Sequence, residues 1–290
     1  MLHASTSKTI LCCDGSRAHE AICLKEKTVR NGSKVQLDML VMPKNSDVRI
    51  RWAGPQKVFT ILTQAFSDLS FVPVQQAQYG FDWFCYARNI NLAEFQRLQA
   101  FQQHLKEVIV IDDNLDECFA LDYHSLNGAR TSMGSLVYAA KPYSHTLTDE
   151  HVKASKELAQ HYIAFIQRHP LYRQAPYIVS VPPSTLDKPF DLPSELVYAI
   201  CLSTGKKMFD AGLRKIRPTR EMKDCQTDQE KVMNISGAFI ADGDSFNVGD
   251  VIIILDDIYM SGHTLNEVTR MLRPKGAPMV LGLVATKTQN

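Results

Sequence analysis

Two adjacent carboxylates near the end of the chain, Asp256 and Asp257, directly follow the apolar run 251–255. Five consecutive apolar residues, most of them β-branched, predict a strand that is buried on both faces, as in the middle of a parallel sheet. Small and polar residues come next, and the apolar positions of 265–273 then recur at helical spacing. The sequence therefore predicts a strand, an acidic turn, a small-residue loop and a helix.

The small-residue loop has the composition of a phosphate-binding site. Its residues are Tyr259, Met260, Ser261, Gly262, His263 and Thr264. Glycine and hydroxyl residues at a helix start allow several backbone N–H groups to point at one anion, which the helix dipole also favours. Two carboxylates beside a phosphate would repel it unless they face neutral hydroxyls or a cation on the same ligand. A ribose 5-phosphate has this arrangement, so we predict that Asp256 and Asp257 contact ribose hydroxyls.

A second apolar run that ends in two carboxylates, residues 108–113, allows a comparison within the chain. Its continuation, residues 114–118, contains two further acidic residues and no glycine. Such a loop repels phosphate rather than binding it. We therefore interpret 108–113 as an ordinary strand end and keep the phosphate-site hypothesis for 256–264.

The composition is that of a soluble globular protein. Of the 290 residues, 45% are hydrophobic and 22% charged, and the net charge of +1 implies no wholesale attraction to nucleic acid or membrane. No apolar run approaches the roughly 18 to 20 residues of a membrane span, and the polar N-terminus is not typical of a signal peptide. The seven cysteines include no Cys-x-x-Cys pair, which favours free thiols over a zinc site or a disulfide framework. We expect a cytoplasmic protein with no membrane partner.

Residues 1–114 predict a small α+β module whose role the sequence does not indicate. A hairpin is expected around Asn31-Gly32, a strong turn signal between paired strands. Amphipathic helices are expected at 56–69 and 92–105. This module is the candidate surface for a homodimer or for a protein partner.

Residues 115–290 predict an α/β domain in which strands alternate with helices. The pattern predicts strands at 136–140 and 177–181 and helices at 148–168 and 193–203. Such alternation indicates a parallel sheet with right-handed crossovers and helices on its faces. Ligands of these sheets bind beyond the carboxyl ends of the strands.

The loop after the strand 177–181 is the second candidate part of the site. It contains Ser184 and Lys188, which offer a small donor and a cation to pyrophosphate oxygens. The basic segment 214–231, which includes Arg217, predicts a mobile and exposed lid over a charged ligand. A solvated charged loop is the alternative interpretation of this segment.

Residues 251–265 resemble the phosphoribosyl-pyrophosphate (PRPP) signature of the type I phosphoribosyltransferases. The shared order is apolar strand, Asp-Asp, aliphatic residue, any residue, a Thr/Ser-rich pair, Gly, any residue and Thr. Met260 departs from it, because Thr or Asp is usual there, and His263 stands where Ala or Lys is frequent. The resemblance implies a type I phosphoribosyltransferase-like parallel sheet flanked by helices.

Residues 120–286 are similar, more narrowly, to the ComF-like proteins of this fold. The matching features are Val181-Pro-x-Ser184, Lys188 with Phe190, Arg217-x-Thr219, Gln226, Lys231, Asn234 and Gly237-Ala238-Phe239. Lys188 and Lys231 stand where that family tends to have Arg. The four-Cys zinc module that normally precedes the domain is replaced here by residues 1–114.

The resemblance implies a glycosyltransferase (pentosyltransferase) that transfers phosphoribosyl from PRPP to an acceptor and releases pyrophosphate. Asp256 and Asp257 are then the catalytic pair, residues 259–264 bind the 5-phosphate, and Ser184, Lys188 and Arg217 bind pyrophosphate. Mg²⁺ enters bound to PRPP, without direct protein ligands. A base, a nucleotide or single-stranded DNA are the candidate acceptors.

Two other functions remain open on the sequence. One is a non-catalytic module that binds PRPP or a nucleotide and acts in regulation or near DNA, as the ComF-like resemblance allows. The other, a phosphoreceiver, is less favoured because those domains carry their acid pair near the domain start. No residue is an evident base for the acceptor, and His263 is more typical of a structural part of the phosphate loop.

Overall fold

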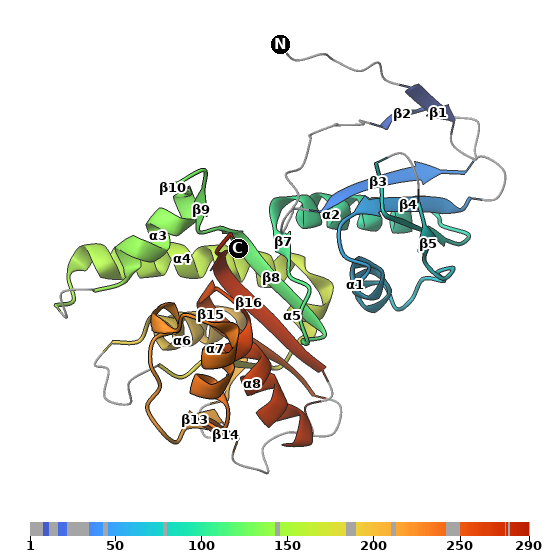
Figure 1. The fold of residues 1–290 in the computed structure, drawn as a ribbon. Helices are drawn as coiled ribbons and strands as arrows, with labels where there is room; N and C mark the ends of the chain where they lie inside the picture. Colours follow the sequence, from blue (N-terminus) through green and yellow to red (C-terminus); the bar gives the residue numbers. More distant parts are fainter. Residues whose placement is uncertain are drawn as a thin grey trace. The chain divides into compact units, whose positions relative to one another are not determined.

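The computed structural model divides into two compact units, Met1–Val110 and Ile111–Asn290 (Figure 1). The sequence alone predicts the boundary after residue 114. The structure describes residues 8–11, 17–21, 35–42, 46–77, 80–142, 146–183, 190–209, 213–241, 250–275, 277 and 279–289. The hairpin expected around Asn31-Gly32 lies outside the described residues. Both units combine helices with sheet.

The N-terminal unit is built around a four-stranded antiparallel sheet in the order β3-β4-β6-β5. Its strands are β3 (Gln36–Val41), β4 (Val48–Ala53), β5 (Gln75–Gln76) and β6 (Trp83–Ala87), and a separate hairpin joins β1 (Lys8–Leu11) and β2 (Arg17–Ala21). The helices α1 (Val58–Ala65) and α2 (Leu92–Glu107) fall within the ranges expected from their apolar periodicity or close to them. The core includes Trp52, Ile61 and Leu98, each at most 1% exposed.

The C-terminal unit is organised by a sheet whose strands follow the order β12-β11-β15-β16-β8. These strands are β8 (Glu117–Tyr123), β11 (Tyr177–Ser180), β12 (Lys207–Met208), β15 (Val251–Tyr259) and β16 (Met279–Lys287). From β12 to β8 every neighbouring pair is parallel. Residues 252–255 of the central strand β15 are fully buried, which confirms the buried strand and the α/β class.

Helices cover this sheet on both faces. They are α3 (Ser132–Ala140), α4 (Asp149–Arg168), α5 (Pro170–Gln174), α6 (Leu192–Thr204) and α8 (His263–Leu272). Figure 1 shows α8 in front of the sheet and α4 crossing behind it. The helices α3 and α4 contact each other, and both contact β8 and β16. Among the described residues, no helix combines the length and the apolar composition needed to cross a membrane.

The strand expected at 136–140 is wrong, because these residues form the second half of α3. Thr131 caps this helix, since its side-chain oxygen accepts a hydrogen bond from the backbone N–H of Gly134. Val137 and Ala140 are buried while Tyr138 is exposed, which is helical rather than alternating burial. The short apolar run looked like a strand because its length alone does not separate the two structures.

The basic segment expected to be a mobile lid contains regular structure. The strands β13 (Leu213–Lys215) and β14 (Phe239–Ala241) pair antiparallel, and between them lie the 3-10 turn η1 (Met222–Asp224) and the helix α7 (Asp228–Ile235). Thr227 caps α7 by accepting from the N–H of Glu230. These elements place α7 against α8.

Candidate functional site

Asp256 and Asp257 lie inside β15 and not in a turn after it, which corrects the expectation of an acidic turn. The strand continues because its parallel pairing with β16 extends to Ile258↔Thr286 and Tyr259↔Lys287. On its other side β15 pairs with β11 up to Leu255, and the N–H of Val181 donates to the carbonyl of Leu255. The two carboxylates are therefore held by a strand at the carboxyl edge of the sheet.

The chain turns sharply between β15 and α8, and the turn depends on Gly262. The backbone of Gly262 has φ +77°, and a Cβ at this position would lie 2.2 Å from the hydroxyl oxygen of Tyr259. The helix begins at His263, two residues earlier than its apolar periodicity indicates, and its ladder starts with the bond from Asn266 N–H to the Gly262 carbonyl. The first N–H groups of a helix have no intrahelical acceptor, so this turn can present them to an anion.

The hydroxyl of Tyr259 packs against Gly262 in this turn. Its side chain is buried, and burial together with the neighbouring carboxylate of Asp113, with which the hydroxyl forms a hydrogen bond, raises its pKa well above the ordinary value. The loop that carries Asp113 belongs to the second acidic run of the sequence. That run therefore supports the candidate site through a tyrosine contact that the sequence does not show.

Asp256 sits where ionisation is unfavourable. Burial and the adjacent Asp257 carboxylate raise its pKa to about 8, although its own contact with the N–H of Asp257 and the charge of Lys141 act in the opposite direction. The strand is fixed at this point because the hydroxyl of Tyr162, on α4, donates to the backbone carbonyl of Asp256 at 2.7 Å. A hydrogen-bonding ligand would relieve the cost of this carboxylate.

Asp257 is paired with a residue that the sequence analysis missed. The ammonium nitrogen of Lys141 lies 2.7 Å from Oδ2 of Asp257. Lys141 immediately follows α3, so recognition of 132–140 as a helix would have placed a cation at its C-terminus, where the helix dipole favours one. The expected strand at 136–140 hid this signal.

A histidine at the same edge of the sheet was also missed. His124 directly follows β8, and its Nδ1 lies 3.2 Å from the hydroxyl of Thr286 in β16. Burial, Arg130 and Lys141 lower the pKa of His124, while Asp257 raises it. The lowered pKa favours a neutral imidazole in the surroundings of the Lys141–Asp257 pair.

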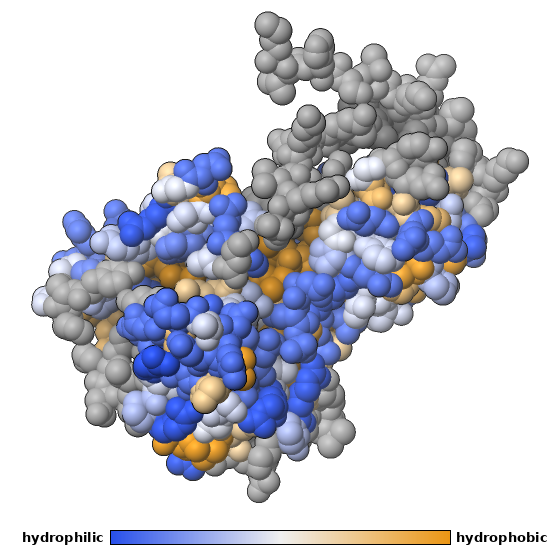
Figure 2. All heavy atoms as spheres, viewed as in Figure 1, coloured by the Kyte–Doolittle hydropathy of each residue, from blue (hydrophilic) through white to orange (hydrophobic). Residues whose placement is uncertain are grey.

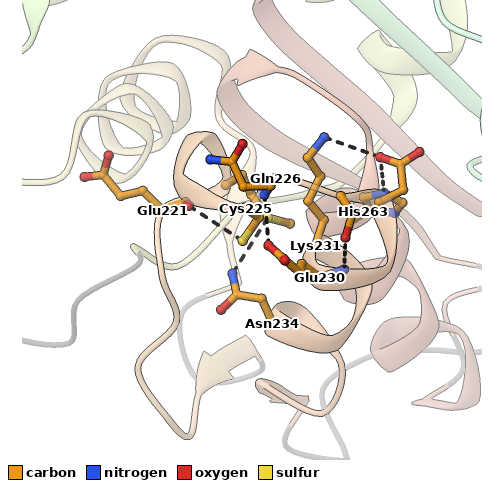
Figure 3. A network of polar contacts seen from close by, with 10 residues as sticks. Glu221, Cys225, Gln226, Glu230, Lys231, Asn234 and His263 are labelled. Carbon is orange, nitrogen blue, oxygen red and sulfur yellow. Dashed lines mark hydrogen bonds and ion pairs between the residues drawn. The ribbon is translucent and has the colours of Figure 1, made fainter.

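The helix α7 contacts the start of α8 through the carboxylate of Asp228, which lies near both Lys231 and His263. Asp228 Oδ1 lies 3.3 Å from Lys231 Nζ and 3.7 Å from His263 Nε2. Figure 3 shows Lys231 and His263 on either side of this contact, within a wider network of polar groups of α7 and the turn before it. The exposed Asp228 thus brings a negative charge to the proposed phosphate loop.

A buried lysine connects the segment 213–241 to the strand β11. Lys215 Nζ donates to the carbonyl of Pro183 at 3.0 Å and to the hydroxyl of Thr219 at 2.7 Å. Burial lowers its pKa to about 8. Lys215 therefore ties the chain just beyond β11 to the segment that carries α7.

The three residues expected to bind pyrophosphate are only partly placed. Ser184 and Lys188 lie outside the described residues. The guanidinium of Arg217 donates to the carbonyl of Ser236 at 2.7 Å and to that of Pro218 at 3.4 Å. In this structure the hydrogen bonds of Arg217 therefore go to residues of the segment 213–241, to which Arg217 itself belongs.

A groove of about 570 Å³ runs along α8. Its lining is Asn114, Val232, Ile235, Ser236, His263, Asn266, Glu267, Thr269, Arg270 and Arg273. Glu267 is held by Arg270 and by the N–H of Gly237, and Arg273 contacts Asp116. Figure 2 shows mainly hydrophilic residues over α7 and α8. The groove meets the proposed phosphate loop at His263.

The described residues contain no cluster of three or more histidines, cysteines or acidic residues that could hold a metal ion. Within the same part of the chain, Cys85, Cys118, Cys201 and Cys225 occur as thiols and not in disulfides. Asp257 is engaged by Lys141, and burial disfavours ionisation of Asp256, so this pair does not form a ready site for Mg²⁺. Neither the comparison with protein-family models nor that with curated proteins found a match to this sequence.

Proposed function

We propose that residues 115–290 form a type I phosphoribosyltransferase-like domain, similar to the ComF-like proteins, that binds PRPP and transfers its phosphoribosyl group. The observation that carries the proposal is the juxtaposition at the end of β15. Two carboxylates on a buried central parallel strand lie beside a glycine turn that opens α8. This combination suits a ligand with hydroxyls at one end and a phosphate at the other.

Asp256 and Asp257 accept hydrogen bonds from the ribose hydroxyls in this proposal. The backbone N–H groups and hydroxyls of residues 260–264 bind the 5-phosphate, and Tyr259 supports them from below. Such transfer passes through a cation-like ribose, so most of the catalytic effect comes from holding the sugar and stabilising the departing pyrophosphate.

Ser184, Lys188 and Arg217 bind the pyrophosphate in the same proposal. Mg²⁺ accompanies PRPP and neutralises part of the pyrophosphate charge when bound. Lys215 supports this function indirectly, since it links the chain after β11 to the segment of Arg217. The acceptor is a base, a nucleotide or single-stranded DNA, and the protein works in the cytoplasm.

The alternative is a PRPP- or nucleotide-binding module without transferase activity, which acts in regulation or near DNA. One observation favours it. His263 is engaged by Asp228 through α7, so the histidine of the phosphate loop serves as a contact between helices rather than as a base for the acceptor. The N-terminal unit would then bind a second copy of the chain or a protein partner.

Pyrophosphate release separates the two functions. The full chain is incubated with PRPP and Mg²⁺ and with purine bases, pyrimidine bases, nucleotides or single-stranded DNA in turn. A transferase releases pyrophosphate with one acceptor class and not with the others, and Asp257→Asn abolishes that release. PRPP binding without pyrophosphate across the whole panel contradicts the transferase and supports the regulatory module.

A further inference from the structure

Lys141 is the cation closest to the proposed ribose site among the contacts of Asp256 and Asp257 in the described structure. Its ammonium nitrogen is 2.7 Å from Oδ2 of Asp257, and it reaches the carboxyl edge of the sheet from the end of α3. A ligand-binding role for this pair rests on the proposed function.

The pair is open to a ligand. The side chain of Lys141 is 25% exposed and that of Asp257 is 12% exposed. A cation that only compensated a buried charge would need no exposure, whereas this ion pair keeps surface at the edge of the sheet where α/β proteins bind their ligands. Its groups can therefore be shared with a bound molecule.

The chemistry of the pair is complementary to a hydroxyl group. Lys141 has three N–H donors and no acceptor, and an ionised Asp257 accepts only. A hydroxyl both donates and accepts, so one sugar hydroxyl can donate to Asp257 while a neighbouring hydroxyl oxygen accepts from Lys141. The adjacent Asp256 supplies further acceptor capacity on the same strand.

We propose that Lys141 and Asp257 act together as a donor–acceptor pair that recognises the vicinal diol of a ribose 5-phosphate. The pair makes the site select ribose over 2-deoxyribose, because the deoxy sugar lacks one hydroxyl and forms one hydrogen bond fewer to these charged groups. Hydrogen bonds to charged groups are the ones whose loss weakens binding most. Lys141 is thus a ligand-binding residue that sets the substrate class.

The test is calorimetric titration of the full chain with ribose 5-phosphate, 2-deoxyribose 5-phosphate and inorganic phosphate. The wild type binds ribose 5-phosphate roughly tenfold or more tightly than the deoxy sugar. In Lys141→Met the preference for ribose falls to the part that Asp256 and Asp257 alone provide, and the affinity for inorganic phosphate is unchanged because residues 260–264 are intact. Lys156→Met, the same change at an exposed position of α4, keeps the wild-type ratio.

Lys141→Gln is the second variant, because it retains an N–H donor without the charge and removes less from the packing. It shows a ratio between those of the wild type and Lys141→Met. The inference is overturned while the proposed function stands if the wild type binds both sugars equally, or if both Lys141 variants keep the wild-type ratio. The proposed function fails as well if the wild type binds neither sugar phosphate.

Discussion

Asp256 and Asp257 are neighbours in sequence but differ in their surroundings. Asp257 is compensated by Lys141, whereas burial and the charge of Asp257 keep the pKa of Asp256 raised. Groups that destabilise the folded protein yet are positioned by good hydrogen bonds are typical of functional sites. Because of this difference, the ionisation of Asp256 can be followed through the stability of the ligand-free protein.

Asp256→Asn is expected to stabilise the ligand-free protein at alkaline pH. The pKa of Asp256 is about 8 in the folded protein and about 3.9 in the unfolded chain. The contribution of Asp256 to the free energy of unfolding is therefore fully present below about pH 4 and is lost as the pH rises through about 8. Asparagine does not ionise and removes this loss. The gain is about 1–3 kcal/mol at pH 8 and shrinks toward pH 4.

Urea unfolding from pH 4 to pH 9 measures this gain, with Asp149→Asn at an exposed position of α4 as the control. The control shows the effect of removing an exposed carboxylate at each pH. A gain that grows toward acid pH, or a profile of Asp256→Asn parallel to that of the wild type, contradicts the raised pKa.

At the scale of elements, the turn between β15 and α8 determines the phosphate loop. Gly262 has a positive φ, and its α-carbon faces the Tyr259 hydroxyl so closely that a Cβ does not fit. Gly205, the C-cap of α6, has a similar φ of +72° but open space around it. A comparison of Gly262 with Gly205 therefore separates the cost of the left-handed backbone from the cost of steric contact with Tyr259.

Gly262→Ala is expected to lower the free energy of unfolding by about 2–4 kcal/mol, since it combines a left-handed backbone with the Tyr259 contact. Gly205→Ala costs about 1–2 kcal/mol because only the backbone term applies. Chemical denaturation of both variants measures the difference. Equal losses would show that Tyr259 does not pack against the turn as described.

The sequence predicts the local part of this site well and the non-local part poorly. The buried strand, the glycine turn and the helix follow from composition and spacing within 251–273. Lys141 and His124 reach the site from α3 and from the end of β8, and nothing near them in sequence marks their partners. The only local sign of Lys141 is its position at the C-terminus of α3, and this sign is lost when residues 136–140 are predicted to be a strand.

The same division holds for the whole molecule. Alternating strands and helices were enough to predict a parallel α/β sheet, because each element carries its own periodicity. The basic segment 214–231 is predicted from sequence to be mobile because it has many cations and few apolar residues. Its order comes from caps, from the buried Lys215 and from the pairing of β13 with β14, which are contacts between distant positions.

For the whole molecule, we expect PRPP to bind at the end of β15. The most direct measurement is the midpoint of thermal unfolding with and without PRPP and Mg²⁺, for the wild type, Asp256→Asn/Asp257→Asn and the control Asp149→Asn. A ligand at a hundredfold excess over its Kd stabilises by about 2.7 kcal/mol, which is roughly 5–10 °C for a protein of this size. We expect this shift for the wild type and the control and none for the double variant. Equal protection of the double variant, or no protection of the wild type, would contradict it.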